Sequence, residues 1–226
     1  MDARSLRDQT IRDAKCNLIL DAARKVFAEK GFHESRLEDI AAESGFSKAS
    51  LYNYFNDKDE IFLNLAVRDF ENLLNTLISI TSSSEPFFIN LEKLIRTSLA
   101  FFGDQSSFII SITNFHVIRK LNPERLVQHH KIISEKFSKQ YHAITAFYTK
   151  LIEEAQKRGE LITTLPAAVI TRYITTLIRG VFIEWKMKGE KGDPERETQY
   201  LLTFIRNGIG KTNTGSTLTE SPVEQQ

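Results

Sequence analysis

"LEDIAAESGFSKASLYNYF", residues 37–55, contains two short helical patterns on either side of Gly45. Ala41 is small enough to let two helices cross closely, and Gly45 tolerates the positive φ that a tight turn requires. Ser47 then stands where it can cap a second helix. This order predicts a helix-turn-helix motif over about residues 37–56, whose buried wedge comprises Ile40, Phe46, Leu51 and Tyr54.

The second helix of this motif separates its apolar side chains from its polar ones. Leu51 and Phe55 have the spacing of a buried helix face, and no acidic residue occurs between positions 44 and 56. A surface rich in hydrogen-bond donors is typical of a helix that contacts base edges and phosphates of DNA. The side that would face DNA holds Lys48, Ala49, Ser50, Tyr52 and Asn53.

Two further cations, Arg36 and Lys58, flank the motif and are placed to pair with neighbouring phosphates. The N–H groups at the start of the second helix, near Ser47, also favour a phosphate. The alternative is a plain helical packing corner with a solvated polar face. This alternative stays open, because residues 1–59 carry ten basic and eleven acidic residues. DNA binding would therefore depend on where individual cations lie and not on a net positive field.

Helical spacing continues before the motif. An apolar stripe from about Asn17 ends at Gly31, a good helix terminator, and residues 1–13 are either frayed or an extension of this first helix. Ser35 and Glu38 have the spacing of a capping box, which predicts that Ser35 caps the second helix of the chain.

Helical spacing also continues after the motif, where Asp57 is expected to cap a fourth, long helix that ends before the serine-rich break at 81–86. Residues 122–159 form either one very long helix or two helices joined by a kink. The fold expected is therefore all-α with about nine helices. The other expected helices are 87–102, 107–120, one from Pro166 to the loop at 189–194, and one after that loop.

Composition excludes several classes of protein. The chain has 226 residues, a formal net charge of +1 and one cysteine, Cys16, so it has no internal disulfide. We found no signal peptide and no apolar run long enough to cross a membrane, which favours a cytoplasmic protein. No metal-ligand spacing, catalytic triad or phosphate-binding loop is present, so we expect no metal, no cofactor and no enzymatic activity.

Residues 19–66, "ILDAARKVFAEKGFHESRLEDIAAESGFSKASLYNYFNDKDEIFLNLA", resemble the DNA-binding domain of the TetR family of bacterial transcriptional regulators. The motifs that carry the resemblance are "AARKVFAEKGF", "LEDIAAESGFSKASLYNYF" and "KDEIF". The family implies an all-α homodimer, usually a repressor, with a variable carboxy-terminal domain for ligand binding and dimerisation. The expected domains are therefore 14–66 for DNA binding and 67–210 for ligand binding and dimerisation, with a disordered tail at 211–226.

Matched residue by residue, the resemblance places Ser47, Lys48, Ala49, Ser50, Tyr52, Asn53, Tyr54 and Lys58 at recognition-helix and phosphate-contacting positions. This chain has Arg36 where the family commonly has threonine or serine, and Tyr54 where it often has histidine. Both side chains can still reach a phosphate, and both differences bear on which operator is bound.

The second domain contains an unusual number of phenylalanines, which are either ordinary core residues or the wall of an apolar ligand pocket. If these phenylalanines line a pocket, a few polar side chains there would orient the ligand. The pocket residues expected are Phe101, Phe102, Phe108, Asn114, Phe115, His116 and Tyr141.

The last two helices carry two apolar stripes and one glycine that permits close approach of another helix. These stripes either complete the core of one chain or, as the resemblance implies, form a four-helix dimer interface with a second copy. The residues expected there are Ile170, Ile174, Leu177, Gly180, Val181, Trp185, Leu201, Phe204 and Ile205. Two recognition helices reach successive major grooves only when they are held about 34 Å apart, which gives dimerisation a physical purpose.

The function predicted is a homodimeric repressor that a small apolar or amphipathic ligand releases from a palindromic DNA operator. The alternative is a helical small-molecule carrier whose amino-terminal domain contacts protein and not DNA. The acid-free donor face of residues 44–56 argues against that alternative.

Overall fold

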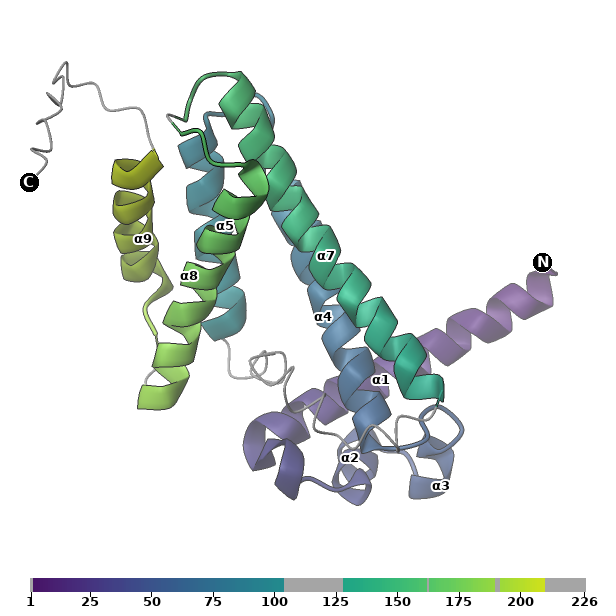
Figure 1. Cartoon of the computed structure of the whole chain (residues 1–226). Coiled ribbons are helices and arrows are strands. Elements are labelled where there is room, and N and C mark those ends of the chain that lie inside the picture. The colour runs from purple at the N-terminus through teal and green to yellow at the C-terminus, as the bar shows by residue number, and fades with distance from the viewer. Residues whose placement is uncertain (1, 104–127, 162, 190–191, 210–226) are drawn as a thin grey trace, which may run out of the picture.

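The computed structural model describes residues 2–103, 128–161, 163–189 and 192–209, which form eight helices and no β-strand (Figure 1). The expected all-α fold is confirmed. The expected helix at 107–120, the Asn122–Pro123 start of the next helix and the tail at 211–226 lie outside the described residues. Over the described ranges, no helix is both long enough and apolar enough to cross a membrane.

Helices α1 (Ala3–Glu34), α2 (Leu37–Ser44) and α3 (Lys48–Leu51) gather at one end of the molecule, around the start of α4 (Lys58–Ile80) (Figure 1). The residues before Asn17 extend α1. Gly31, predicted to end the first helix, has φ 76° and ψ 160°, so regular helical geometry breaks there. Asp57 caps α4 as predicted, because its side chain accepts a hydrogen bond of 2.7 Å from the Glu60 N–H.

The prediction that Ser35 caps α2 is wrong. The Ser35 hydroxyl donates to the Phe32 carbonyl at 2.8 Å, so this buried side chain closes the end of α1. Helix α2 begins after Arg36, whose backbone N–H donates to the Asp39 carboxylate at 2.8 Å. The reciprocal half of a capping box needs a side-chain acceptor at the first position, and arginine has none.

The other end of the molecule contains α5 (Phe87–Gly103), α8 (Ala167–Lys188) and α9 (Pro194–Ile209), while α7 (Gln128–Lys157) packs along α4 (Figure 1). From Gln128 to Lys157 the long helical pattern forms one helix. One cluster of buried apolar side chains extends from α1 to α9. The predicted domain boundary at residue 66 therefore lies within α4, whose two halves share one core.

Two ion pairs join α1 to the middle of α4 in the described part of the chain. The Arg24 guanidinium is paired with Asp69, which is 2% exposed, and Arg68 is paired with Asp21 at 2.8 Å. Burial raises the pKa of Asp69, although Arg24 opposes this effect. These ion pairs join the helix-turn-helix end to α4, which continues into the rest of the chain.

Candidate nucleic-acid interface

The turn between α2 and α3 has the geometry that its sequence predicts. Gly45 has φ 72°, and the Phe46 N–H donates to the Ala41 carbonyl at 3.1 Å, which closes α2. Ile40 is fully buried and Ala41 is 5% exposed, so both lie in the wedge between the helices.

Helix α3 is a single helical turn with a clear division of its sides. Ser47 caps it, since the Ser47 hydroxyl accepts a 3.1 Å hydrogen bond from the Ser50 N–H. Leu51 and Phe55 are buried, as predicted. The helix ends at Leu51 and not near Phe55, because the Tyr54 N–H turns back to the Leu51 carbonyl at 2.9 Å in a tighter turn.

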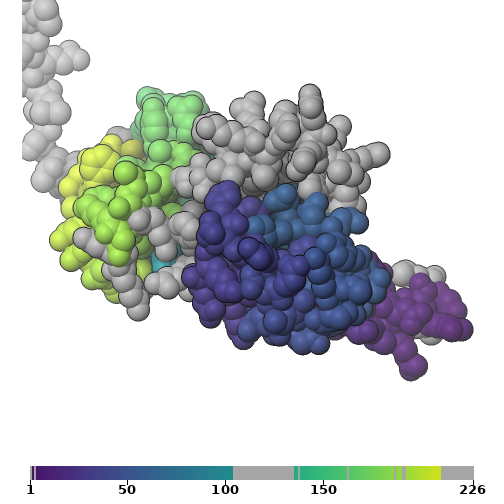
Figure 2. Space-filling model, turned by 90° about the horizontal axis from the view of Figure 1, so that it is seen from below, coloured from purple at the N-terminus to yellow at the C-terminus, as the bar shows by residue number. Residues whose placement is uncertain are grey.

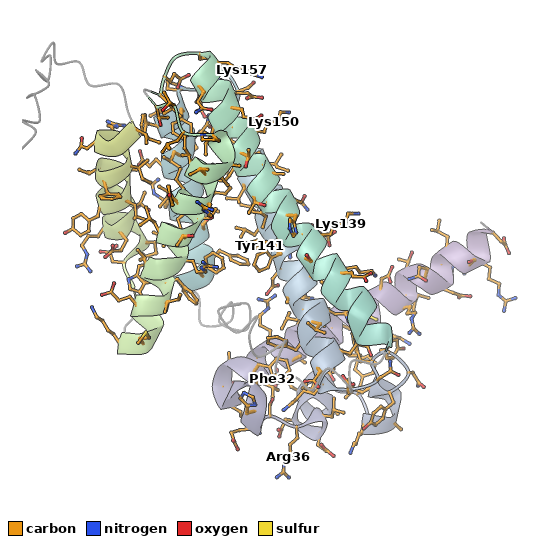
Figure 3. The ribbon with its side chains drawn as sticks, in the orientation of Figure 1. Phe32, Arg36, Lys139, Tyr141, Lys150 and Lys157 are labelled. Carbon is orange, nitrogen blue, oxygen red and sulfur yellow. The ribbon has the colours of Figure 1, made fainter. Side chains whose placement is uncertain are left out.

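The side of α3 opposite this core is open to solvent. Tyr52 is 49% exposed, and Asn53 and Arg36 are also exposed. Arg36 points away from the molecule at its lower end (Figure 3). From below, this end presents a surface made of the amino-terminal helices (Figure 2). We call the exposed set the donor face, comprising Arg36, Ser47, Lys48, Ala49, Tyr52 and Asn53.

Lys48 of the donor face has an acidic partner that the local sequence does not reveal. Its ammonium lies 2.5 Å from the Glu38 carboxylate of α2. This hydrogen bond raises the pKa of Lys48 and lowers the pKa of Glu38. Both side chains are exposed, so the pair is weak and an incoming phosphate can replace Glu38.

Lys58 occupies a different environment from the one expected of a phosphate contact. Its ammonium donates to the carbonyl oxygens of Phe32 at 2.5 Å and Ser35 at 2.8 Å, and it lies 4.5 Å from the centroid of the Phe32 ring. Burial lowers the pKa of Lys58. In this structure Lys58 joins the end of α1 to the start of α4, so any phosphate would compete with these carbonyl groups.

Two other predicted DNA-binding residues are partly enclosed. Ser50 is half-buried, and its hydroxyl lies 2.8 Å from the Ser47 hydroxyl. Tyr54 is half-buried and packs edge-on against Phe46, with 6.0 Å between ring centroids. Both lie at the margin of the donor face.

The predicted ligand pocket is described only in part, because Phe108, Asn114, Phe115 and His116 lie outside the described residues. Phe101 is half-buried and packs edge-on against Phe70 of α4, with 6.4 Å between ring centroids. The ring centroids of Phe102 and of Phe182 on α8 lie 5.4 Å apart. Tyr141 is 40% exposed and points from α7 toward the side where α8 lies (Figure 3).

The predicted dimer interface divides into two groups. Five of its residues are at most 8% exposed within the single chain, so their side chains pack in its own core, as the alternative held: Ile170, Ile174, Trp185, Leu201 and Ile205. Phe204 is 67% exposed, Gly180 is exposed, and Leu177 and Val181 are half-buried. Three further apolar side chains that the sequence analysis missed are exposed on the same two helices, namely Tyr173, Met187 and Tyr200.

Residues 19–65 match the family model described as bacterial regulatory proteins, tetR family. The transcriptional repressor BepR of Brucella suis is 25% identical over 179 residues, which cover 77% of this chain and 81% of BepR. The transcriptional regulator UidR of Escherichia coli is 23% identical over 166 residues, which cover 74% of this chain and 79% of UidR.

The fold is shared with solved structures. FadR of Bacillus subtilis, in complex with stearoyl-CoA, has a TM-score of 0.69 at 21% identity, over 85% of this chain and 98% of FadR. A transcriptional regulator from Saccharomonospora viridis, in complex with choline, has a TM-score of 0.70 at 23% identity, over 88% of this chain and 99% of that protein. Residues 19–65 thus match the tetR family of bacterial regulatory proteins, and the chain as a whole is similar in sequence to transcriptional regulators such as BepR and UidR.

Proposed function

We propose that this protein is a homodimeric transcriptional repressor that binds a palindromic DNA operator and leaves it when a small apolar or amphipathic molecule binds. It would act in the cytoplasm, without enzymatic activity. The observation that carries the proposal is the division of residues 47–55, which bury Leu51 and expose Lys48, Tyr52 and Asn53. A solvent-exposed helix with donors on one side fits a groove of duplex DNA.

The donor face supplies the groups that DNA recognition needs. Tyr52 and Asn53 would contact base edges or sugar-phosphate oxygens, while Arg36 and Lys48 would pair with phosphates. Ser47, Ala49, Ser50 and Tyr54 would complete the surface. Lys58 is assigned an indirect role here, because its contacts with the Phe32 and Ser35 carbonyls set the angle between α1 and α4.

Dimerisation is proposed through the exposed residues of α8 and α9. Tyr173, Leu177, Gly180 and Val181 on α8 and Phe204 on α9 leave apolar surface on one chain that a second copy would cover. The two copies would hold their α3 helices in successive major grooves.

Ligand control is proposed to act through α4. Phe101 stands at the end of α5 and touches Phe70 of α4, so a molecule that displaces Phe101 changes the packing of α4. Arg24 and Arg68 would carry that movement to α1. The ligand must prefer the non-binding arrangement, since only a difference in affinity shifts the balance. Related folds hold molecules as unlike as stearoyl-CoA and choline, so the fold alone leaves the ligand open.

The test is selection of a duplex from a random-sequence pool by the wild-type protein, followed by titration of variants against that duplex. Tyr52→Ala and Lys48→Ala should each weaken binding by about 1–3 kcal/mol while the protein stays a folded dimer. Lys139→Ala removes an exposed charge from α7, remote from α3 (Figure 3), and should bind like wild type.

The salt dependence of binding separates the proposal from the carrier alternative. Phosphate contacts make the logarithm of the affinity fall linearly with the logarithm of the salt concentration. A protein that selects no duplex, or Tyr52→Ala and Lys48→Ala variants that bind as tightly as wild type, would contradict the assigned surface.

A further inference from the structure

The amino-terminal part of α1 brings a charged side chain to the helix-turn-helix. Arg12 is exposed, and its guanidinium carbon lies 5.3 Å from the centroid of the Tyr54 ring. Tyr54 is itself fixed by its contact with Phe46. Arg12 precedes residues 19–65, which the family model covers, so the model assigns it no role.

Arg12 has no acidic partner within the described part of the chain, whereas three lysines around the helix-turn-helix do. Lys25 is paired with Glu43 at 2.9 Å, Lys30 with Asp39 at 2.7 Å, and Lys48 with Glu38. The nearby Asp13 carboxylate accepts a hydrogen bond from Gln9 at 2.7 Å. The Arg12 guanidinium therefore lies, without a carboxylate partner, beside a residue at the margin of the donor face.

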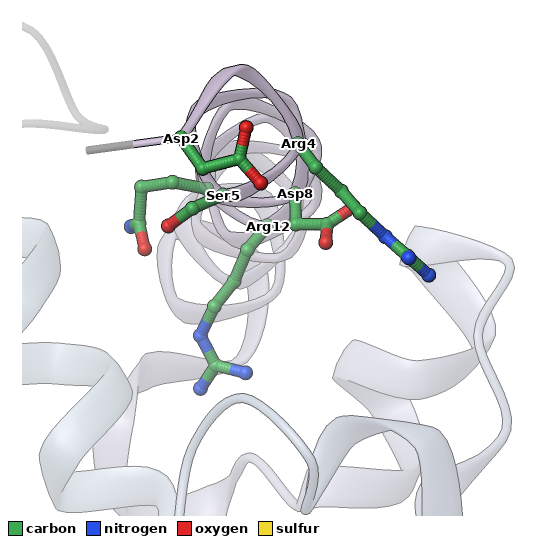
Figure 4. Close-up of a pocket in the computed structure, with 6 residues that line it drawn as sticks. Asp2, Arg4, Ser5, Asp8 and Arg12 are labelled. Atoms are coloured by element: carbon green, nitrogen blue, oxygen red, sulfur yellow. The ribbon is translucent and has the colours of Figure 1, made fainter.

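Arg12 also lies at one end of an open hollow of about 420 Å³ along α1. All its lining residues belong to α1 or its cap, namely Asp2, Arg4, Ser5, Asp8, Gln9 and Arg12 (Figure 4). Two acidic and two basic side chains balance in this lining, so the hollow as a whole does not favour an anion. Figure 4 shows Arg12 extending away from Asp2 and Arg4.

We propose that Arg12 is an additional phosphate-binding residue of the DNA interface, held in position by the ring of Tyr54. This inference rests on the proposed DNA-binding function. A guanidinium over an aromatic ring is partly immobilised and still presents its N–H groups at its edge, where two of them can bind one phosphate. Arg12 and Arg36 would then supply phosphate contacts beside the paired Lys48.

The experiment measures the affinity of the full-length protein for the duplex that the wild-type protein selects, over a series of salt concentrations. Arg12→Ala should reduce the slope of log affinity against log salt by about 0.9 for each Arg12 in the bound assembly, or about eightfold in affinity per copy at 0.1 M salt. Arg7→Ala is the matched control, because Arg7 is an exposed arginine of the same part of α1 and lies outside the hollow.

Arg7→Ala should leave the slope unchanged. An unchanged slope for Arg12→Ala would overturn the inference, and so would an equal loss for Arg7→Ala, which would indicate a diffuse field. Weaker binding by Arg12→Ala at an unchanged slope would also overturn it, since Arg12 would then only position Tyr54. Circular dichroism and the unfolding midpoint confirm that both variants are folded. Failure of the wild-type protein to select any duplex would instead refute the proposed function itself.

Discussion

Residues 47–55 bury Leu51 and Phe55 and expose polar side chains, whereas α8 and α9 leave large apolar side chains at the surface. Leu51 is 1% exposed while Tyr52, its neighbour, is 49% exposed. On α9 the neighbouring residues Ile205 and Phe204 are both apolar, but Ile205 is 6% exposed and Phe204 is 67% exposed.

The surface of residues 47–55 and the exposed face of α8 and α9 therefore suit different kinds of partner. Hydroxyl, amide and cationic groups at a surface suit a hydrated polyanion, because its phosphates and bases can replace the water that the groups bind. An exposed phenylalanine and methionine suit a surface that excludes water, such as the same face of a second copy. The separation of these surfaces along α4 is what the proposed DNA-binding dimer would need.

The largest expected effects come from two adjacent residues of α9. Ile205→Ala should lower the free energy of unfolding by about 2–5 kcal/mol, because it empties space in the core of the chain. Phe204→Asp should leave the helical content of the chain unchanged and convert the dimer to a monomer, because it places a charge in the proposed interface. Chemical denaturation measures the first effect and analytical ultracentrifugation the second.

These two variants control for each other. Ile205→Ala should remain a dimer in spite of its lower stability. A dimeric Phe204→Asp variant would show that the exposed face of α9 is not the dimer interface.

An effect of intermediate size is expected from Lys58→Met. Methionine fills similar space but cannot donate hydrogen bonds to the Phe32 and Ser35 carbonyls, so the free energy of unfolding should fall by about 1–3 kcal/mol. Urea denaturation of the variant and wild type gives the difference. Unchanged stability together with weaker, less salt-dependent DNA binding would instead favour the phosphate contact predicted from the sequence.

The sequence predicts the turn and the two sides of α3 well because these features depend on neighbours close in the chain. Gly45, Ser47 and Leu51 act within about ten residues of one another, and each has a local physical cause. The Lys48–Glu38 pair and the position of Lys58 depend on how α2 and the end of α1 approach α3 and α4, which periodicity does not encode.

The apolar stripes of α8 and α9 show a second limit of prediction from helical spacing. Apolar spacing identifies residues that leave water, but it does not distinguish burial in one chain from burial between two. Ile170 and Ile174 have the same helical spacing as Leu177 and Val181, yet only the first pair is fully buried within the chain. Only the packing of α8 against α5, α7 and α9 separates them.

A small effect on DNA binding is predicted for the Lys48–Glu38 pair beside the donor face. Glu38→Gln removes the carboxylate beside Lys48 and leaves a side chain of nearly the same shape, so the fold and the unfolding midpoint should not change. Duplex DNA should bind roughly two- to fivefold more tightly, because Lys48 no longer exchanges an acidic partner for a phosphate and one repulsive charge is lost from the surface. The control is Glu43→Gln, which frees Lys25 on α1 by the same chemistry, away from α3. Equal gains for both variants would mean that any lost acid helps, whereas a gain confined to Glu38→Gln would show that Lys48 contacts the DNA backbone.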